Sequence, residues 1–169
     1  MAAFTQKYTI IQLLEDTPEG AEYSANEWPL HVTIADTFSI DWQGGKLLDK
    51  LTELLARHKT ALSKASRDEY FGPKKETQVT LLDMSQDLLD LHNDLINFLK
   101  KAGALFNDPQ YSGSGFRAHA TVQSHARLQA GDLVKFNELT LIDMFPKGDP
   151  YQRKLLKKMK LSNNDHTKE

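Results

Sequence analysis

The sequence His31-Val32-Thr33-Ile34 recurs later in the chain as His119-Ala120-Thr121-Val122. Side chains along a strand alternate between two faces, so the histidine and threonine of each copy share one face. The aliphatic residues of each copy then share the opposite face, where they can join a core. Two such strands each present an imidazole and a hydroxyl on a polar face. The pattern therefore predicts an acid–base pair built from two strands.

Both copies lie in similar surroundings. Each follows an aromatic residue, Trp28 or Phe116, and a segment rich in turn-forming residues. The histidines and threonines of this chain would form roughly 0.4 His-x-Thr pairs by chance, so two are unusual. The alternative interpretation is that each histidine only ends a strand and bonds a neighbour. That alternative explains one copy well and the pair poorly.

The paired motifs resemble those of the 2H phosphoesterase superfamily. Its members include the bacterial and archaeal 2′-5′ RNA ligase-like proteins, which act as RNA 2′,3′-cyclic phosphodiesterases. The spacing of 88 positions between His31 and His119 fits the family, and the resemblance covers about residues 4–145. It implies an α+β fold of two pseudo-symmetric lobes of mostly antiparallel sheet with flanking helices. A motif strand from each lobe would face a central cleft.

Length and composition set broader limits. A chain of 169 residues, 40% hydrophobic and 26% charged, is typical of a globular protein. We expect one bilobal domain over residues 1–161 and a disordered tail over 162–169. The absence of cysteine excludes disulfides and thiolate chemistry. A formal net charge of −2 argues against a protein that coats nucleic acid, although a local basic cleft is sufficient for an RNA end or a small nucleotide.

The N-terminal segment has no charged leader followed by a long apolar run. We therefore expect a cytoplasmic protein with no membrane segment, and a monomer. Hydrophobic spacing predicts the other elements. Strands are expected at 8–14, 30–38, 60–71, 77–82, 116–123 and 133–145, and helices at 46–58 and 85–101. Ser85 is the expected N-cap of the second helix. Short turns between strands favour antiparallel sheets and an α+β class.

Two segments leave alternatives open. Residues 107–115 are rich in glycine and serine and form either a connector or a substrate lid. Residues 151–161 carry five basic residues and form either a short amphipathic helix or a final strand. That basic segment either contacts RNA or is a solvated surface element.

The resemblance also implies a reaction. Water opens a 2′,3′-cyclic phosphate while one histidine removes its proton and the other protonates the departing ribose oxygen. By resemblance, His31 is the proton donor and His119 the proton acceptor; the spacing alone does not assign these roles. Thr33 and Thr121 would donate hydrogen bonds to the phosphate oxygens. We expect no metal and no cofactor, since the other histidines are scattered: His58, His92, His125 and His166.

Two further residues share the face of His119 and are expected to bind the substrate phosphate. Arg117 is the candidate cation, with a surface salt bridge as the alternative, and Gln123 is a candidate hydrogen-bond donor. The family often has a proline before the second motif and an arginine after it, whereas this chain has Ala118 and Gln123. This departure affects the substrate more than the chemistry. We interpret Lys74 and Lys75 as solvated turn residues.

Four aromatic residues are candidates for stacking on a base, with packing as the alternative: Trp28, Phe38, Tyr111 and Tyr151. Three hypotheses follow. The first is a metal-independent phosphodiesterase acting on a 2′,3′-cyclic phosphate of RNA or a nucleotide, or on a 2′-5′ linkage. The second is a non-catalytic module of the same fold that binds a nucleotide or an RNA end. The third is an interaction protein whose histidines only stabilise strands.

Overall fold

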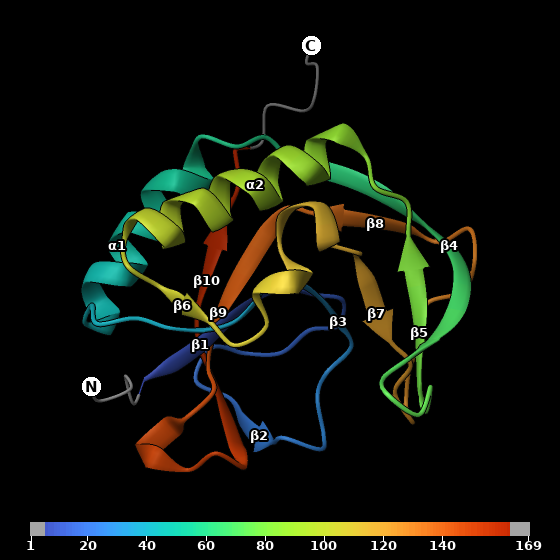
Figure 1. The fold of residues 1–169 in the computed structure, drawn as a ribbon, viewed down its shortest axis with the longest axis horizontal. Helices are drawn as coiled ribbons and strands as arrows, with labels where there is room; N and C mark the ends of the chain where they lie inside the picture. The colour runs from blue at the N-terminus through green and yellow to red at the C-terminus, as the bar shows by residue number, and fades with distance from the viewer. Residues whose placement is uncertain (1–5, 163–169) are drawn as a thin grey trace.

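The N-terminal strand β1 (Lys7–Leu13) lies inside the larger of two antiparallel sheets in the computed structural model, which describes residues 6–162 (Figure 1). It pairs with β3 (His31–Ser39) on one side and with β9 (Glu138–Asp143) on the other. This sheet has the order β2-β10-β9-β1-β3-β6. Its remaining strands are β2 (Glu22–Ser24), β6 (Leu105–Phe106) and β10 (Gln152–Lys160).

The middle of the chain forms the smaller sheet, of order β7-β5-β4-β8. Its strands are β4 (Ala61–Phe71), β5 (Thr77–Leu82), β7 (His119–Thr121) and β8 (Leu133–Phe136). The first motif therefore begins a strand of one sheet, and the second motif forms an edge strand of the other. The expected α+β class with mostly antiparallel sheets is confirmed.

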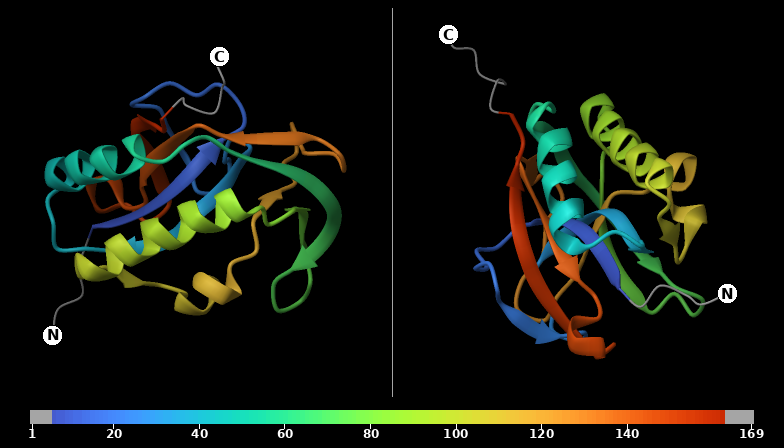
Figure 2. Two further views of the ribbon diagram at one scale, coloured as in Figure 1. Left: turned by 90° about the horizontal axis from the view of Figure 1, so that it is seen from above. Right: turned by 90° about the vertical axis from the view of Figure 1, so that its left-hand side faces the viewer.

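Two amphipathic helices, α1 (Gly44–Ala56) and α2 (Gln86–Lys101), lie on the same side of the molecule (Figures 1 and 2). Their leucines and the inward side chains of both sheets form one core, which buries the apolar sides of both motif strands. The expected N-cap is confirmed, because Ser85 Oγ accepts a hydrogen bond of 3.3 Å from the N–H of Leu88.

The prediction of a single strand over 133–145 is wrong. The segment forms β8 in the smaller sheet and β9 in the larger, and the chain crosses between sheets at Asn137. The N–H groups of Asn137 and Glu138 leave the sheet ladder and donate to Gln12 Oε1, at 3.1 and 3.3 Å. This contact between residues 125 positions apart has no local sequence signature.

The second motif strand is also shorter than the predicted 116–123. Residues Gly113–Gly115 form a 3₁₀ turn and the chain is extended from Phe116, but only His119–Thr121 pairs with β5 as a strand. Of the two alternatives for 151–161, the strand is the correct one, since β10 pairs with β2 at its start and with β9 from Lys154 to Lys160.

No helix among residues 6–162 combines the length and the apolar character needed to cross a bilayer. Ser162, the first residue of the expected tail, is held by its N–H, which donates to the carbonyl of His58 at 2.6 Å. The rest of that expected tail, including His166, lies outside the described residues.

Candidate active site

His31 is the first residue of β3, and its ring is fixed from two sides. Its Nδ1 lies 2.7 Å from the carbonyl oxygen of Pro29, and its ring lies 4.7 Å from the ring of Trp28. A carbonyl only accepts hydrogen bonds, so Nδ1 carries the proton and the neutral ring keeps its lone pair on Nε2. Thr33 follows on the same face, while Val32 and Ile34 are buried in the core.

His119 is the first residue of β7 and repeats this arrangement. Its Nδ1 lies 2.8 Å from the carbonyl oxygen of Arg117, again two residues earlier, and its ring meets the ring of Phe71 edge-on at 4.8 Å. Thr121 lies on the same face, while Ala120 is buried in the core. The two motifs therefore match in local bonding as well as in sequence, and each directs the basic Nε2 of its histidine away from its own backbone.

The two motifs meet across the boundary between the sheets, where β3 and β7 are neighbours. Burial lowers the pKa of His31 below its ordinary value, and the nearby charge of His119 lowers it further. Burial also lowers the pKa of His119, where the carboxylate of Asp36 acts in the opposite sense. The charge of His119 thus affects the protonation of His31, and Asp36 on the strand of His31 affects that of His119.

A cavity of about 740 Å³ opens beside β7. Of the six residues that the sequence predicts for the site, four line it: Thr33, Arg117, His119 and Thr121. His31 and Gln123 are absent from the lining. His31 is half-buried with Trp28 against its ring, and Gln123 directs its amide towards the carbonyl of Thr121 at 3.4 Å.

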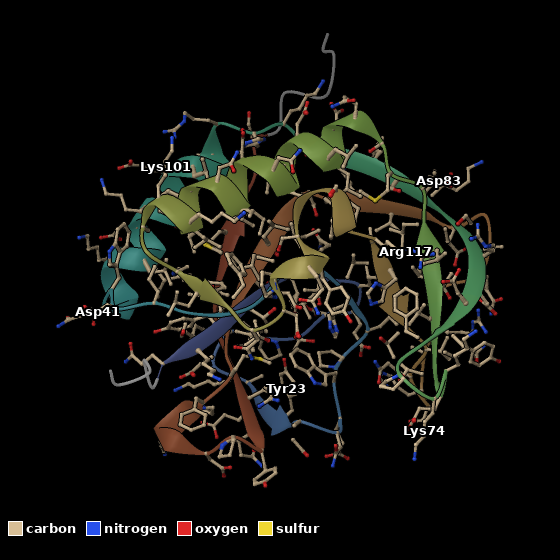
Figure 3. All side chains as sticks on the ribbon, viewed as in Figure 1. Tyr23, Asp41, Lys74, Asp83, Lys101 and Arg117 are labelled. Atoms are coloured by element: carbon tan, nitrogen blue, oxygen red, sulfur yellow. The ribbon has the colours of Figure 1, made fainter. Side chains whose placement is uncertain are left out.

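Arg117 lies on the segment that enters β7 (Figure 3). Its guanidinium makes a two-pronged ion pair with Glu69, with distances of 2.8 and 3.0 Å, and stacks over Phe71 at 5.2 Å. This pair lowers the pKa of Glu69. Arg117 therefore makes the salt bridge that is the alternative expectation, and it also lines the cavity; its contact with a phosphate stays a prediction.

The cavity also contains residues that sequence reasoning missed or took as solvated. Asp36 lines it from β3, after two register shifts between β3 and β1 that disturb the simple alternation of side chains. Burial raises the pKa of Asp36. Lys75 lines it from the turn between β4 and β5, although it is exposed. Aromatic side chains form much of the remaining wall: Tyr70, Phe71, Tyr111 and Phe116.

The four aromatic candidates for base stacking have different positions. Tyr111 lines the cavity and is exposed. Phe38 is fully buried in the core, so packing is its role. Trp28 packs on His31 and meets Tyr23 edge-on at 5.2 Å. Tyr151 is 76% exposed and is absent from the cavity lining.

Besides the contact between β3 and β7, a side-chain hydrogen bond links the end of β1 in the larger sheet to the segment after β7. Glu15, just beyond β1, accepts hydrogen bonds from the N–H of Leu30 and from His125 Nε2, the latter at 2.7 Å. Burial acts to raise the pKa of Glu15, but these two bonds outweigh it and lower the pKa. The contact fixes the residue before His31 and joins the two sheets beside the motifs. No group of metal-ligating side chains occurs among residues 6–162.

Comparison with solved structures identifies the fold. A protein described as a phosphoesterase and LigT of E. coli complexed with 3′-AMP each match with a TM-score of 0.55 at 19% identity. Both alignments cover 94% of this chain. They cover 99% of the phosphoesterase chain and 98% of the LigT chain. TT0787 of Thermus thermophilus matches with a TM-score of 0.54 at 13% identity, over 94% of this chain and 99% of that one.

No family model and no curated protein sequence matches the chain. The structural matches nevertheless span nearly the whole chain, and the chain has a LigT-like α+β fold. The fold implied by the two short motifs is thereby confirmed at identities where sequence similarity alone gives little information.

Proposed function

We propose that the protein is a metal-independent phosphodiesterase of the 2H type, which hydrolyses a 2′,3′-cyclic phosphate on RNA or on a nucleotide. The observation that carries the proposal is the matched bonding of the two motif histidines. Each donates Nδ1–H to the carbonyl two residues earlier, at 2.7 and 2.8 Å, and each therefore keeps Nε2 available to exchange a proton with a substrate.

In the proposed reaction, water attacks the phosphorus atom and a new P–O bond forms while one ribose P–O bond breaks. One imidazole accepts the proton that the water loses, and the other gives a proton to the departing ribose oxygen. The product is a phosphomonoester, and the two imidazoles have exchanged protonation states. The resemblance assigns donation to His31 and acceptance to His119.

The threonines and Arg117 are proposed to stabilise the negative charge of the phosphate group. Thr33 and Thr121 both line the cavity, one from each motif strand, which supports the proposal that their hydroxyls donate to the two non-bridging oxygens. Arg117 uses two of its donors on Glu69 and retains others for a phosphate. Gln123, which is half-buried just beyond β7, is proposed as a more distant hydrogen-bond donor.

The cavity provides room for more than a phosphate group. Its volume of about 740 Å³ falls in the range of sites for small organic ligands. Its aromatic wall is suited to a nucleoside. LigT structures complexed with 3′-AMP and NADP⁺ support binding of a small nucleotide by this fold. A cytoplasmic monomer that acts on RNA ends or free nucleotides remains our expectation from the sequence.

The test is hydrolysis of 2′,3′-cyclic nucleotides and 2′-5′-linked dinucleotides with EDTA present. The panel comprises the wild type, His31→Ala, His119→Ala and the double variant. His58→Ala is the matched control, because His58 pairs with Asp94 on helix α2 and is absent from the cavity lining. Each motif variant should lose about 10²–10⁴-fold in kcat, while His58→Ala keeps its activity. Circular dichroism checks that every variant is folded.

A folded double variant with the parent rate would refute the proposal. Tight binding of a cyclic nucleotide by calorimetry, with no product by chromatography, would instead support the non-catalytic binding module. Neither binding nor turnover would leave the interaction protein as the remaining hypothesis.

A further inference from the structure

The buried histidine of α2 links the two motif strands. His92 is 1% exposed, and its Nδ1 lies 2.8 Å from the carbonyl oxygen of Ile34 on β3. Its Nε2 accepts a hydrogen bond of 3.0 Å from the N–H of Gly113. Its ring also stacks on Phe116, with centroids 3.8 Å apart and the planes within 6° of parallel.

These bonds define the protonation state of the ring. The carbonyl of Ile34 only accepts, so Nδ1 carries a proton. The N–H of Gly113 only donates, so Nε2 carries a lone pair. His92 is therefore neutral, with its proton on Nδ1, and burial keeps its pKa below the ordinary value. No other side chain of similar size supplies a donor, an acceptor and a flat ring in this geometry.

The partners of His92 lie close to the catalytic candidates in sequence. Ile34 lies three residues after His31, and Phe116 lies three residues before His119. His92, Ile34 and Phe116 also line the cavity. The β3 contact and the loop contact involve opposite nitrogens of one rigid ring, so a shift of either segment must break a bond or tilt the ring.

We infer that His92 is a positioning residue, which sets the separation of the two motif histidines by bonding β3 and the loop before β7 at once. The inference rests on the proposed phosphodiesterase activity for its kinetic consequence. It does not require His92 to exchange a proton with substrate, since both ring nitrogens are already engaged.

Three substitutions separate the contributions of the ring. His92→Phe keeps the stacking on Phe116 and removes both hydrogen bonds. His92→Asn retains a donor near the position of Nδ1, for the carbonyl of Ile34. His92→Gln retains an acceptor near the position of Nε2, for the N–H of Gly113. Leu95→Val is the control, because Leu95 is fully buried on the same helix and bonds neither motif segment.

Steady-state kinetics on a 2′,3′-cyclic nucleotide are measured well below each variant's Tm. His92→Phe should lose roughly tenfold to a hundredfold in kcat/KM through misplacement of the reacting groups. His92→Gln should recover KM more fully than His92→Asn, because the loop held by Gly113 lines the cavity. Leu95→Val should keep wild-type kinetics at a comparable loss of Tm. Wild-type kinetics in His92→Phe, or an equal loss in Leu95→Val, would overturn the inference.

Two measurements on the wild type need no turnover. Nitrogen-15 NMR of the His92 ring should show the Nδ1–H tautomer, and the Gly113 amide should be protected from hydrogen exchange until His92 is replaced by Phe. A ring protonated on Nε2, or an unprotected Gly113 amide, would overturn the bridge itself. A wild type that turns over no substrate would instead refute the proposed function.

Discussion

At the scale of single residues, the proposed reaction depends on two histidines with the same internal bond and the same direction of pKa shift. Burial lowers the pKa of His31 and of His119, and the charge of His119 lowers the pKa of His31 further. The acid must hold a proton and the base must lack one at the start of the reaction. The charge on His119 disfavours a second proton on His31, so the two rings are not expected to hold protons independently.

The pH dependence of kcat/KM should therefore be bell-shaped, with its maximum below about pH 6.5, the ordinary pKa of histidine. The rate rises as the base loses its proton and falls as the acid loses its own, and both pKa values are lowered in the free protein. A bound phosphate anion favours the protonated rings, so the profile of kcat should lie at higher pH. Initial rates across about pH 4.5–8.5 check both profiles. A kcat/KM maximum well above pH 7 would contradict the lowered pKa values of His31 and His119.

The assignment of donor and acceptor has its own test. A phosphodiester with a p-nitrophenolate leaving group needs little protonation of that group. If His31 is the donor, His31→Ala should regain much of its lost rate on this ester, while His119→Ala should stay inactive. The ratio of rates on the ester and on a cyclic nucleotide measures this recovery. Recovery in His119→Ala alone would reverse the two roles.

Residue-level predictions from sequence succeed where one strand carries the information. The alternation within 31–34 and 119–122 places Thr33, His119 and Thr121 on the cavity wall, as in the structure, whereas His31, predicted from the same alternation, does not line the cavity. The position of Asp36 depends on two register shifts against β1, and that of His92 on contacts with β3 and Gly113. Those contacts join segments distant in sequence, which periodicity does not detect.

At the scale of elements, the segment 109–115 before β7 is tightly folded rather than a loose connector. It contains two short 3₁₀ turns, and Gly115 approaches the carbonyl of Gln110 so closely that a Cβ there would lie 1.9 Å from the oxygen. Gln110, Tyr111, Gly115 and Phe116 line the cavity. The shape of this segment thus sets one wall of the candidate site.

Gly115→Ala should distort this wall, because the added methyl group overlaps backbone, which yields little. We expect KM for a cyclic nucleotide to rise roughly tenfold and the free energy of unfolding to fall by about 1–3 kcal/mol. Gly45→Ala in α1 is the control, since nothing lies within 4 Å of its Cβ position and alanine favours a helix. Kinetics and urea unfolding measure both effects. Unchanged kinetics in Gly115→Ala would show that the wall tolerates the shift.

Elements whose own hydrophobic residues recur at regular spacing are predictable from sequence. They include both helices and the β4–β5 hairpin. The split of 133–145 is not predictable, because the N–H groups at the crossing bond to the side chain of Gln12, which is distant in sequence. The short strands β2 and β6 are also missed. Each has three residues or fewer and depends on a partner strand for its conformation.

At the scale of the whole molecule, three buried or half-buried histidines have lowered pKa values: His31, His92 and His119. In the unfolded chain each takes up a proton near pH 6.5, whereas in the folded protein each does so only at lower pH. The unfolded state therefore binds more protons between the folded and the unfolded pKa values. The contribution of these histidines to the free energy of unfolding is fully present above about pH 6.5, and it is lost as the pH falls towards the folded pKa values.

When the pH is lowered from about 7.5 to about 5.5, the Tm measured by calorimetry should accordingly decrease. His92→Gln removes one of the three titrating groups, so its Tm should fall less over the same interval, whatever its absolute value. A Tm that is constant or rises on acidification would contradict the lowered pKa values. An unchanged slope in His92→Gln would exclude His92 as a contributor.

The pairing of β1 with β9 also affects how the chain can fold during synthesis. β1 is translated before its partner Glu138–Asp143 and the adjacent β10, and the strands β2 to β8 lie between them in the sequence. One flank of β1, with its fully buried Ile10 and Ile11, therefore stays uncovered until β9 has been translated. We expect nascent chains halted before residue 138 to be sensitive to protease and to recruit chaperones, with resistance gained only once β9 and β10 are free to pair.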